Sequence, residues 1–139
     1  MPRPKKYQAH LITHTHWDRE WYQSLEIYRF RLIEVFERLK AILPNPDYHS
    51  FYLDGQTIPV DDYLEARPDD RAALMDYIRQ GKLQIGPFYV LLDEQLANGE
   101  SHVRNLMLGQ CSAREYGATA MIGPCDSALS STAPPVWTS

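Results

Sequence analysis

The chain has 139 residues, of which 44% are hydrophobic and 23% are charged, as expected for one soluble globular domain rather than a disordered segment. The net charge of −4 argues against a protein that binds nucleic acid. No apolar run approaches the roughly 20 residues of a membrane helix, and the basic N-terminus lacks the apolar run of a signal peptide. Two cysteines form no disulfide framework. We therefore expect a cytoplasmic protein without nucleic-acid or membrane partners.

The first part of the chain predicts a strand, a helix and a second strand. Residues 6–13, KYQAHLIT, are moderately apolar and end in a polar cluster, so we expect a strand there. In residues 25–43 apolar side chains recur every three or four positions, which predicts an amphipathic helix that the following Pro-Asn-Pro ends. Residues 49–55, HSFYLDG, predict a short aromatic strand closed by a turn at its Asp-Gly pair.

The second part continues this alternation. The expected elements are helices over 60–67 and 69–81, a strand within 82–94 broken at its Gly-Pro pair, a helix over 99–117 ending in glycine, and a final short strand over 118–123. Strands that alternate with helices indicate an α/β fold with a mostly parallel sheet, either open or closed into a barrel. About four strands make an unfinished sheet, so we expect the chain to be truncated.

Residues 124–139, PCDSALSSTAPPVWTS, differ from the rest of the chain. They are rich in serine, threonine, proline and alanine and show no hydrophobic periodicity, which predicts an irregular tail.

The stretch 13–21, THTHWDREW, concentrates groups that can bind a metal or a sugar. It follows the first predicted strand, and sites in parallel α/β folds are built at the carboxyl ends of strands. Alternate residues of an extended segment point the same way, so His14, His16 and Asp18 should share one side. An imidazole and a carboxylate that converge suit Zn²⁺ or a similar divalent cation. A further ligand is needed, and the candidates are Asp54, Asp93, Glu94, His102 and Asp126.

Other polar and aromatic residues admit ordinary structural roles. We expect His10 and His49 to be surface or hydrogen-bonded histidines. Trp17 and Trp21 are either core residues or platforms for the apolar face of a sugar. The pairs Asp61-Asp62 and Asp69-Asp70 are expected on solvated helix faces or at caps, and Cys111 is expected to be buried and inert.

Four ordered blocks of the sequence resemble glycoside hydrolase family 38, the α-mannosidases, with the bacterial branch nearest. They are HLITHTHWDREWY, FYLDGQTIPVDDYLEARPDDRAAL, GKLQIGPFYVLLDEQL and ESHVRNLMLG. The likeness covers residues 7–123, which implies part of that family's N-terminal catalytic domain, the incomplete first part of a parallel-stranded (β/α) barrel. Residues 1–6 are then an N-terminal tail and residues 124–139 an aberrant C-terminal tail.

The resemblance also assigns site residues. It implies that His16 and Asp18 bind a catalytic Zn²⁺ and that Trp21 packs against the sugar held at the metal. The family's nucleophile, also a zinc ligand, belongs to a block that typically reads close to GYLPDSFGH, whereas this chain reads GPCDSALSS. Asp126 is the nearest match, one residue early and without the Phe-Gly-His that should follow. The abrupt departure after Gly123 leads us to expect a frameshift or a truncated gene model.

The implied function is zinc-dependent, retaining hydrolysis of α-mannosidic bonds in oligosaccharides or mannosyl compounds. The family's acid/base and its fourth zinc ligand, a histidine, belong to later segments, so we expect this polypeptide alone to be inactive. Two alternatives stay open. One is another metal-dependent hydrolase of barrel fold, such as an amidohydrolase-like enzyme, in which both His14 and His16 would bind the metal. The other is an inert or merely sugar-binding fragment.

Overall fold

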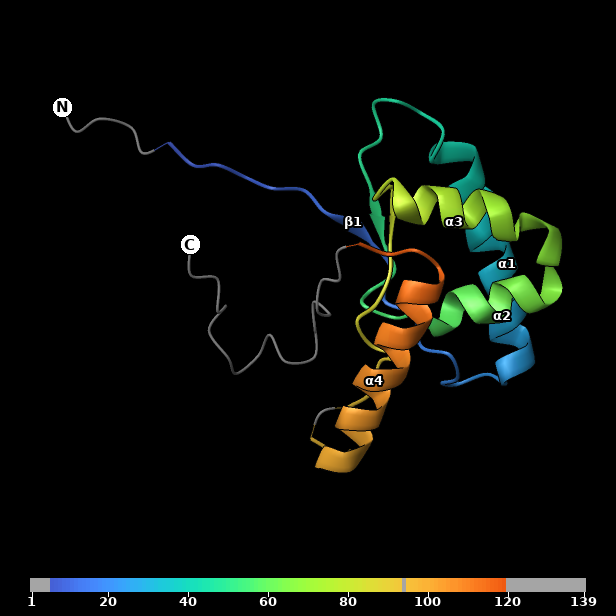
Figure 1. Cartoon of the computed structure of the whole chain (residues 1–139), viewed down its shortest axis with the longest axis vertical. Helices are drawn as coiled ribbons and strands as arrows, with labels where there is room; N and C mark the ends of the chain where they lie inside the picture. Colours follow the sequence, from blue (N-terminus) through green and yellow to red (C-terminus); the bar gives the residue numbers. More distant parts are fainter. Residues whose placement is uncertain (1–5, 94, 120–139) are drawn as a thin grey trace.

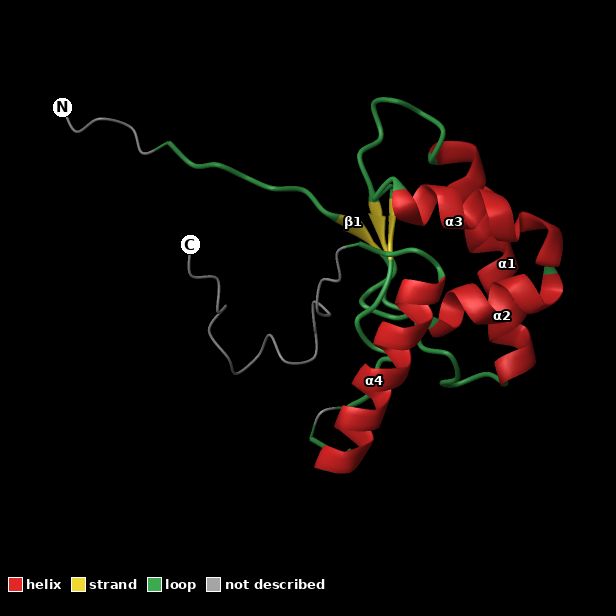
Figure 2. Cartoon of the chain, in the orientation of Figure 1, coloured by secondary structure: helices red, strands yellow, loops and turns green. Residues whose placement is uncertain are grey.

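The computed structural model describes residues 6–93 and 95–119. The elements are, in chain order, β1 (Thr13–His14), α1 (Leu25–Ile42), β2 (Phe51–Tyr52), α2 (Ile58–Ala66), the 3-10 helix η1 (Pro68–Asp70), α3 (Arg71–Arg79), β3 (Leu83–Gln84) and α4 (Gly99–Glu115). Figure 1 shows α1, α2 and α3 gathered on one side of the strands, with α4 running away from them. The predicted alternation of strands and helices is confirmed within these ranges (Figure 2). The strand predicted over 118–123 lies almost entirely outside the described residues.

The strands form one small parallel sheet in the order β1-β2-β3. Thr13 pairs with Phe51, and Phe51 pairs with Leu83, so the three strands start in register. All three carboxyl ends consequently meet at one edge of the sheet, which is where polar side chains from separate strands can come together. The sheet is parallel, as predicted. Closure into a barrel is not seen in these three strands and stays a prediction.

The first strand is much shorter than predicted. Residues 7–12 carry no strand pairing, and Tyr7, Leu11 and Ile12 are 87%, 95% and 68% exposed. The segment runs away from the body of the molecule (Figure 1). A strand needs a hydrogen-bonding neighbour, and β2, the only strand beside β1 in the described sheet, begins at Phe51 opposite Thr13. The apolar pattern therefore overestimated the strand by about half a dozen residues.

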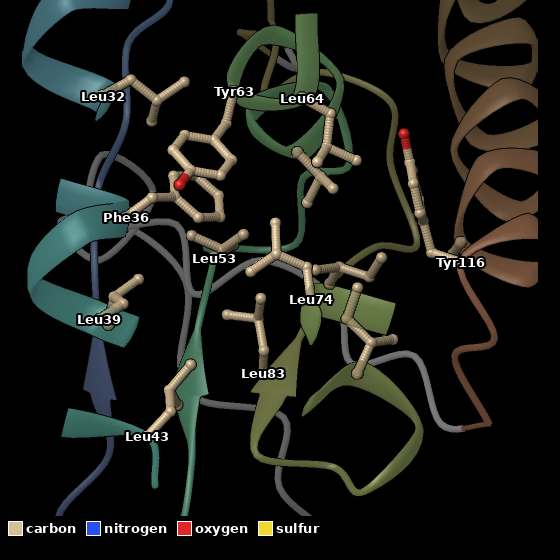
Figure 3. Packing of buried hydrophobic residues seen from close by; sticks show 14 residues of the cluster. Leu32, Phe36, Leu39, Leu43, Leu53, Tyr63, Leu64, Leu74, Leu83 and Tyr116 are labelled. Carbon is tan, nitrogen blue, oxygen red and sulfur yellow. The ribbon is translucent and has the colours of Figure 1, made fainter. Parts of the chain in front are cut away.

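The hydrophobic core lies between the helices α1, α2 and α3 and the sheet (Figure 3). The buried face of α1 consists of Tyr28, Leu32, Phe36 and Leu39, the spacing that the sequence predicted. Phe36 is fully buried and stacks on Tyr63 of α2 with ring centroids 4.3 Å apart. These contacts fix the helices on one face of the strands and leave the carboxyl edge of the sheet open for the site.

Helix α4 packs closely on the segment that follows β3. A Cβ atom added at Gly109 would lie only 2.1–2.3 Å from backbone atoms of Pro87, Phe88 and Tyr89, so only glycine allows this approach. Asn105 strengthens the contact, because its side-chain amide donates to Val90 O (2.7 Å) and its carbonyl oxygen accepts from Val90 N (2.9 Å). The helix therefore holds the residues after β3 beside the carboxyl edge of the sheet.

Two expectations about individual side chains were wrong, those for Asp62 and Cys111. Asp62 is 4% exposed rather than solvated. Its neighbour Asp61 is also part-buried, and burial raises the pKa of this carboxyl, which accepts a hydrogen bond from the hydroxyl of Tyr116. Asp70 lies at the cap position before α3, as predicted, but its carboxylate accepts from Lys40 Nζ (2.7 Å) and makes no side-chain cap. Cys111 is exposed rather than buried.

Within residues 6–93 and 95–119, no helix is both long enough and apolar enough to cross a membrane.

Candidate functional site

Strand β1 delivers the polar stretch 14–18 to the carboxyl edge of the sheet. The strand is anchored by Thr13, whose hydroxyl donates to Ser50 O (2.6 Å) and accepts from the hydroxyl of Tyr48 (2.8 Å). Pairing with β2 continues one residue further, where Thr15 N donates to Tyr52 O (3.2 Å). The chain then leaves the sheet, so residues 16–19 extend past its edge as a loop, which we call the site loop.

The structure brings three predicted side chains together around one imidazole ring. His16 Nδ1 lies 3.0 Å from Asp54 Oδ2, and His16 Nε2 lies 3.8 Å from Asp18 Oδ2. His14 joins this group less closely, because its Nδ1 lies 3.9 Å from Asp54 Oδ1. The side chain of Asp54 is 1% exposed, whereas those of His16 and Asp18 are 41% and 35% exposed. A buried carboxylate thus lies behind His16 and a solvent-accessible one in front of it.

The accessible pair, His16 and Asp18, fits two positions of a zinc site. Two ligands about 2.0–2.2 Å from a tetrahedral zinc lie roughly 3.4 Å from each other. The 3.8 Å between Nε2 and Oδ2 is close to this separation, and both side chains have room to adjust because they are partly exposed. An imidazole nitrogen and a carboxylate oxygen are also donors that zinc accepts.

The third ligand is not among the described residues in a binding arrangement. Asp54 contacts Nδ1 of His16, whereas Asp18 lies beside Nε2 on the opposite side of the ring. The two carboxylates therefore cannot bind the same ion together with His16. Asp93 accepts a hydrogen bond from Gln95 N within its own turn (2.9 Å), and His102 lies near the start of α4. Across 6–93 and 95–119 no group of three or more His, Cys, Asp or Glu residues could hold a metal ion. Glu94 and Asp126 lie outside the described residues.

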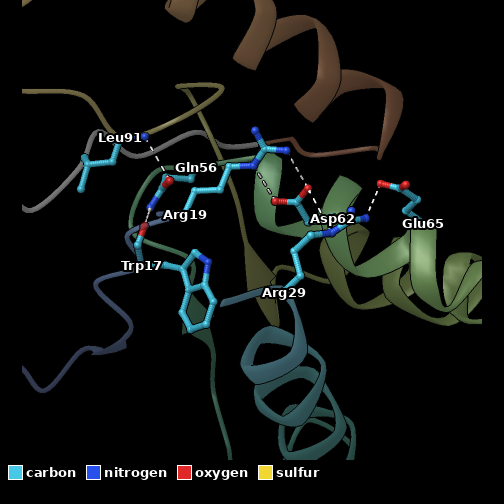
Figure 4. Close-up of polar contacts among 7 residues, drawn as sticks. All are labelled: Trp17, Arg19, Arg29, Gln56, Asp62, Glu65 and Leu91. Carbon is cyan, nitrogen blue, oxygen red and sulfur yellow. Dashed lines mark hydrogen bonds and ion pairs between the residues drawn. The ribbon is translucent and has the colours of Figure 1, made fainter. Parts of the chain in front are cut away.

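Gln56 ties the site loop to the segment after β3. Its side chain is fully buried and bonds on both ends: Nε2 donates to Trp17 O (2.9 Å), and Oε1 accepts from Leu91 N (3.0 Å). Figure 4 shows Gln56 between these two backbone groups. A buried amide with both ends satisfied fixes the groups that it joins. The backbone of Trp17, which lies between His16 and Asp18, is therefore held in place.

The next residue of the loop, Arg19, is held by Asp62 of α2. The guanidinium donates twice, from Nε to Asp62 Oδ2 (2.8 Å) and from a terminal nitrogen to Asp62 Oδ1 (2.9 Å). Figure 4 shows this paired contact, with Arg29 approaching the same carboxylate. The hydrogen bond to Asp62 raises the pKa of Arg19. Two parallel bonds fix the direction of the guanidinium as well as its distance from the carboxylate. The site loop is therefore attached to α2 through Arg19, the residue that follows Asp18.

The turn after β2 has the backbone form that the Asp-Gly pair predicts. Asp54 and Gly55 have φ angles of 49° and 75°, in the left-handed region where aspartate and glycine are the residues most readily accommodated. Leu53 N donates to Gln84 O (2.9 Å) just before the turn, and Gln56 N donates to Leu53 O (3.0 Å) just after it. The turn therefore directs the side chains of Asp54 and Gln56 into the buried space beneath the site loop.

The two tryptophans of the stretch occupy different environments. Trp17 is part-buried, packs against the core and meets the ring of Tyr28 edge-on, with centroids 5.9 Å apart. Trp21 is 69% exposed. Trp17 therefore takes the core role and Trp21 does not, and the role of Trp21 as a platform for a sugar stays a prediction.

Sequence reasoning missed the residues that support the site loop: Arg19, Gln56 and Asp62. One signal for Asp62 was available, because it lies four positions after Ile58 and so shares the apolar face of α2, where a carboxylate needs a partner. No local pattern marked Gln56, whose two partners are 39 and 35 positions away in the chain.

Comparison with known proteins gives a consistent result. Residues 6–120 match the model of the glycosyl hydrolases family 38 N-terminal domain. The chain is 43% identical over 113 residues to a putative mannosylglycerate hydrolase from Halalkalibacterium halodurans, a match that covers 81% of this chain and 13% of that protein.

Two solved structures agree with this. An α-mannosidase from Enterococcus faecalis V583 is 44% identical with a TM-score of 0.75, over 78% of this chain and 12% of that one. A glycosyl hydrolase family 38 protein from Enterococcus faecalis is 42% identical with a TM-score of 0.72, over 81% and 13%. The chain therefore spans about an eighth of the length of these relatives.

Proposed function

The chain belongs to glycoside hydrolase family 38, and from this we propose that it carries the first part of the active site of a zinc-dependent, retaining glycosidase that cleaves α-mannosides. One observation supports the proposal most directly: His16 Nε2 and Asp18 Oδ2 lie 3.8 Å apart at the carboxyl edge of a parallel sheet. The relatives support the substrate class, because one is named an α-mannosidase and another a putative mannosylglycerate hydrolase.

His16 and Asp18 are proposed to hold the cation, His16 through Nε2 and Asp18 through a carboxylate oxygen. When bound, Zn²⁺ supplies a positive charge that binds sugar hydroxyls and orients the ring for attack. The exposed indole of Trp21 follows three residues after Asp18 and offers an apolar face on which the sugar can stack.

Cleavage with retention needs two carboxyl groups about 5–5.5 Å apart, one as nucleophile and one as acid and then base. Asp126 is proposed as the nucleophile and as a further metal ligand, and it lies outside the described residues. The described part of the chain therefore contributes cation binding and sugar positioning rather than the covalent step.

Metal binding by the 139-residue chain is the first test. The chain is labelled with ¹⁵N at histidine and titrated with Zn²⁺ after dialysis against a chelator. We expect the signal of His16 Nε2 to shift on binding, and His16→Ala or Asp18→Ala to weaken binding at least 10-fold. His10→Ala removes an exposed histidine and serves as the control. Equal binding by wild type, His16→Ala and Asp18→Ala would overturn the assignment of the ligands.

Activity is tested by replacing the matching segment of the Enterococcus faecalis α-mannosidase with residues 7–119. We expect the chimera to hydrolyse an aryl α-mannoside and to release mannose of retained configuration first, as followed by NMR. His16→Ala or Asp18→Ala should lower kcat/KM by about 100-fold or more. A chimera whose kcat/KM is unchanged by both substitutions would refute the proposed role.

The amidohydrolase-like alternative predicts a different ligand. It requires His14 on the metal together with His16, whereas the structure directs His14 Nδ1 toward Asp54 Oδ1 at 3.9 Å. Under our proposal His14→Ala changes zinc affinity by less than about 3-fold. A loss of binding comparable with that of His16→Ala would favour the alternative.

A further inference from the structure

We propose that Asp54 is a positioning residue that fixes the proton of His16 on Nδ1 and thereby leaves the lone pair on Nε2 facing Asp18. The role of that lone pair toward a cation rests on the proposed function. The position of the proton on His16 does not rest on it and can be tested in the metal-free chain.

The contact between Asp54 and His16 gives the direction of the hydrogen bond. Asp54 Oδ2 lies 3.0 Å from His16 Nδ1, and a carboxylate is an acceptor only. The imidazole nitrogen must therefore donate, and a neutral ring that carries its proton on Nδ1 has its acceptor on Nε2. Nε2 is the nitrogen on the side of Asp18, at 3.8 Å. The buried carboxylate thus selects the form of the ring that can bind a cation in front of it.

The burial of the two carboxylates separates their roles. The side chain of Asp54 is 1% exposed and that of Asp18 is 35% exposed. A buried carboxylate behind a histidine orients the ring and raises its basicity as a ligand. An accessible carboxylate on the other side can contact a ligand that arrives from solvent. His16 is therefore held at Nδ1 by the buried Asp54, and its Nε2 lies on the accessible side of the ring with Asp18.

The backbone places Asp54 at this position by an uncommon conformation. Its φ of 49° is the only positive value of a non-glycine residue among the described residues. Such a conformation persists where the surroundings determine it strongly, and here β2, β3 and the buried Gln56 hold both sides of the turn. The result is a carboxylate whose oxygens face two histidines, Oδ2 toward His16 of the site loop and Oδ1 toward His14 of β1 at 3.9 Å.

A second buried acid shows that this arrangement is specific. Asp62 is also nearly buried, but its partners are the guanidinium groups of Arg19 and Arg29. Asp62 pairs with guanidinium groups that are charged at any working pH, whereas Asp54 faces imidazole rings whose proton can lie on either nitrogen. Of these two acids, only Asp54 can therefore act on the form of His16.

The test uses the 139-residue chain labelled with ¹⁵N at histidine, free of metal, at pH 9 to keep the imidazoles neutral. Long-range ¹H–¹⁵N spectra report which ring nitrogen carries the proton. We expect His16 to carry it on Nδ1. In Asp54→Asn the amide can donate as well as accept, so we expect the proton to move wholly or partly to Nε2. The control is Asp61→Asn, which removes a part-buried carboxylate bonded to Tyr116 and should leave His16 unchanged.

The outcomes separate this inference from the proposed function. A proton on Nε2 of His16 in the wild-type chain overturns the inference, even if Asp54→Asn fails to fold. An unchanged proton position in a folded Asp54→Asn variant also overturns it. If the proton of His16 is confirmed on Nδ1, Asp54→Asn should weaken Zn²⁺ binding about 10- to 100-fold. A wild-type chain with the proton on Nδ1 and no zinc binding would instead contradict the proposed function and agree with the inference about the proton of His16.

Discussion

The helical body and the site loop are held together by different forces. The body, made of α1, α2 and α3 on the sheet, is joined by buried apolar side chains such as Phe36 and Leu74, which have no exposed surface. The site loop, residues 16–19, has one part-buried apolar side chain, Trp17, and is otherwise attached through polar contacts to Asp54, Gln56 and Asp62.

This difference has a consequence for function. Apolar burial is strong and non-directional, so it decides where the loop emerges but not how its side chains point. Hydrogen bonds are directional, so three buried polar residues decide the orientation of His16 and Asp18. Substitutions in the body should therefore affect stability first, and substitutions among the polar supports should affect the site first.

The largest effect is expected for Phe36→Ala in the body. Phe36 is fully buried and stacked on Tyr63, and truncation of such a ring costs about 3–5 kcal/mol through lost burial and a cavity. Urea unfolding followed by circular dichroism measures the change. Phe30→Ala on the same helix, where the ring is 66% exposed, should cost less than about 0.5 kcal/mol. Similar losses at both positions would show that the body is not packed as described.

A smaller loss of stability but a larger effect on the loop is expected for Gln56→Leu. The substitution leaves Trp17 O and Leu91 N without the partner that each has in the wild type, at a cost of about 2 kcal/mol. Amide hydrogen exchange should accelerate over residues 16–19 more than in α1. The control is Gln80→Leu, at an exposed position after α3. Uniform acceleration across the whole chain would contradict a specific role for Gln56.

The loss expected for Asp62→Ala is about 1–2 kcal/mol. The carboxylate is 4% exposed, but Arg19 is 39% exposed and can be hydrated when its partner is removed, which reduces the cost below that of a fully buried pair. Zinc affinity should fall because the loop loses its anchor on α2. The matched control is Asp76→Ala, which breaks the exposed pair with Arg79 and should change stability by less than about 0.5 kcal/mol. Equal effects would argue that Arg19 is not anchored.

The smallest effect is a pH dependence within the body. The hydrogen bond from Lys40 lowers the pKa of Asp70 below its ordinary value of 3.8. A lowered pKa stabilises the folded state above the ordinary value, and this contribution is lost as the pH falls through the folded-state pKa. Asp70→Asn should therefore be less stable than wild type at pH 7, and the two unfolding curves should approach each other below about pH 4. A difference that grows toward low pH would have the wrong sign.

Much of the body could be predicted because its signals are local. The three- and four-residue spacing of Leu32, Phe36 and Leu39 defines α1, and the proline that follows ends it. Glycine after α3 adopts a φ of 72° at Gly81, as expected at a helix end. The length of β1 could not be predicted, because a strand ends where its neighbour ends and this neighbour lies 38 residues further along the chain.

The sequence by itself determined the helices, the parallel direction of the strands and the closeness of His16 and Asp18, because these depend on periodicity and on short spacing along the backbone. Only the tertiary structure decided that Asp54 lies behind His16 rather than beside Asp18, and that Asp62 is buried against Arg19. Those contacts join residues 38 and 43 positions apart. Contacts between residues so far apart in the chain leave no period in the sequence, so local spacing could not predict them.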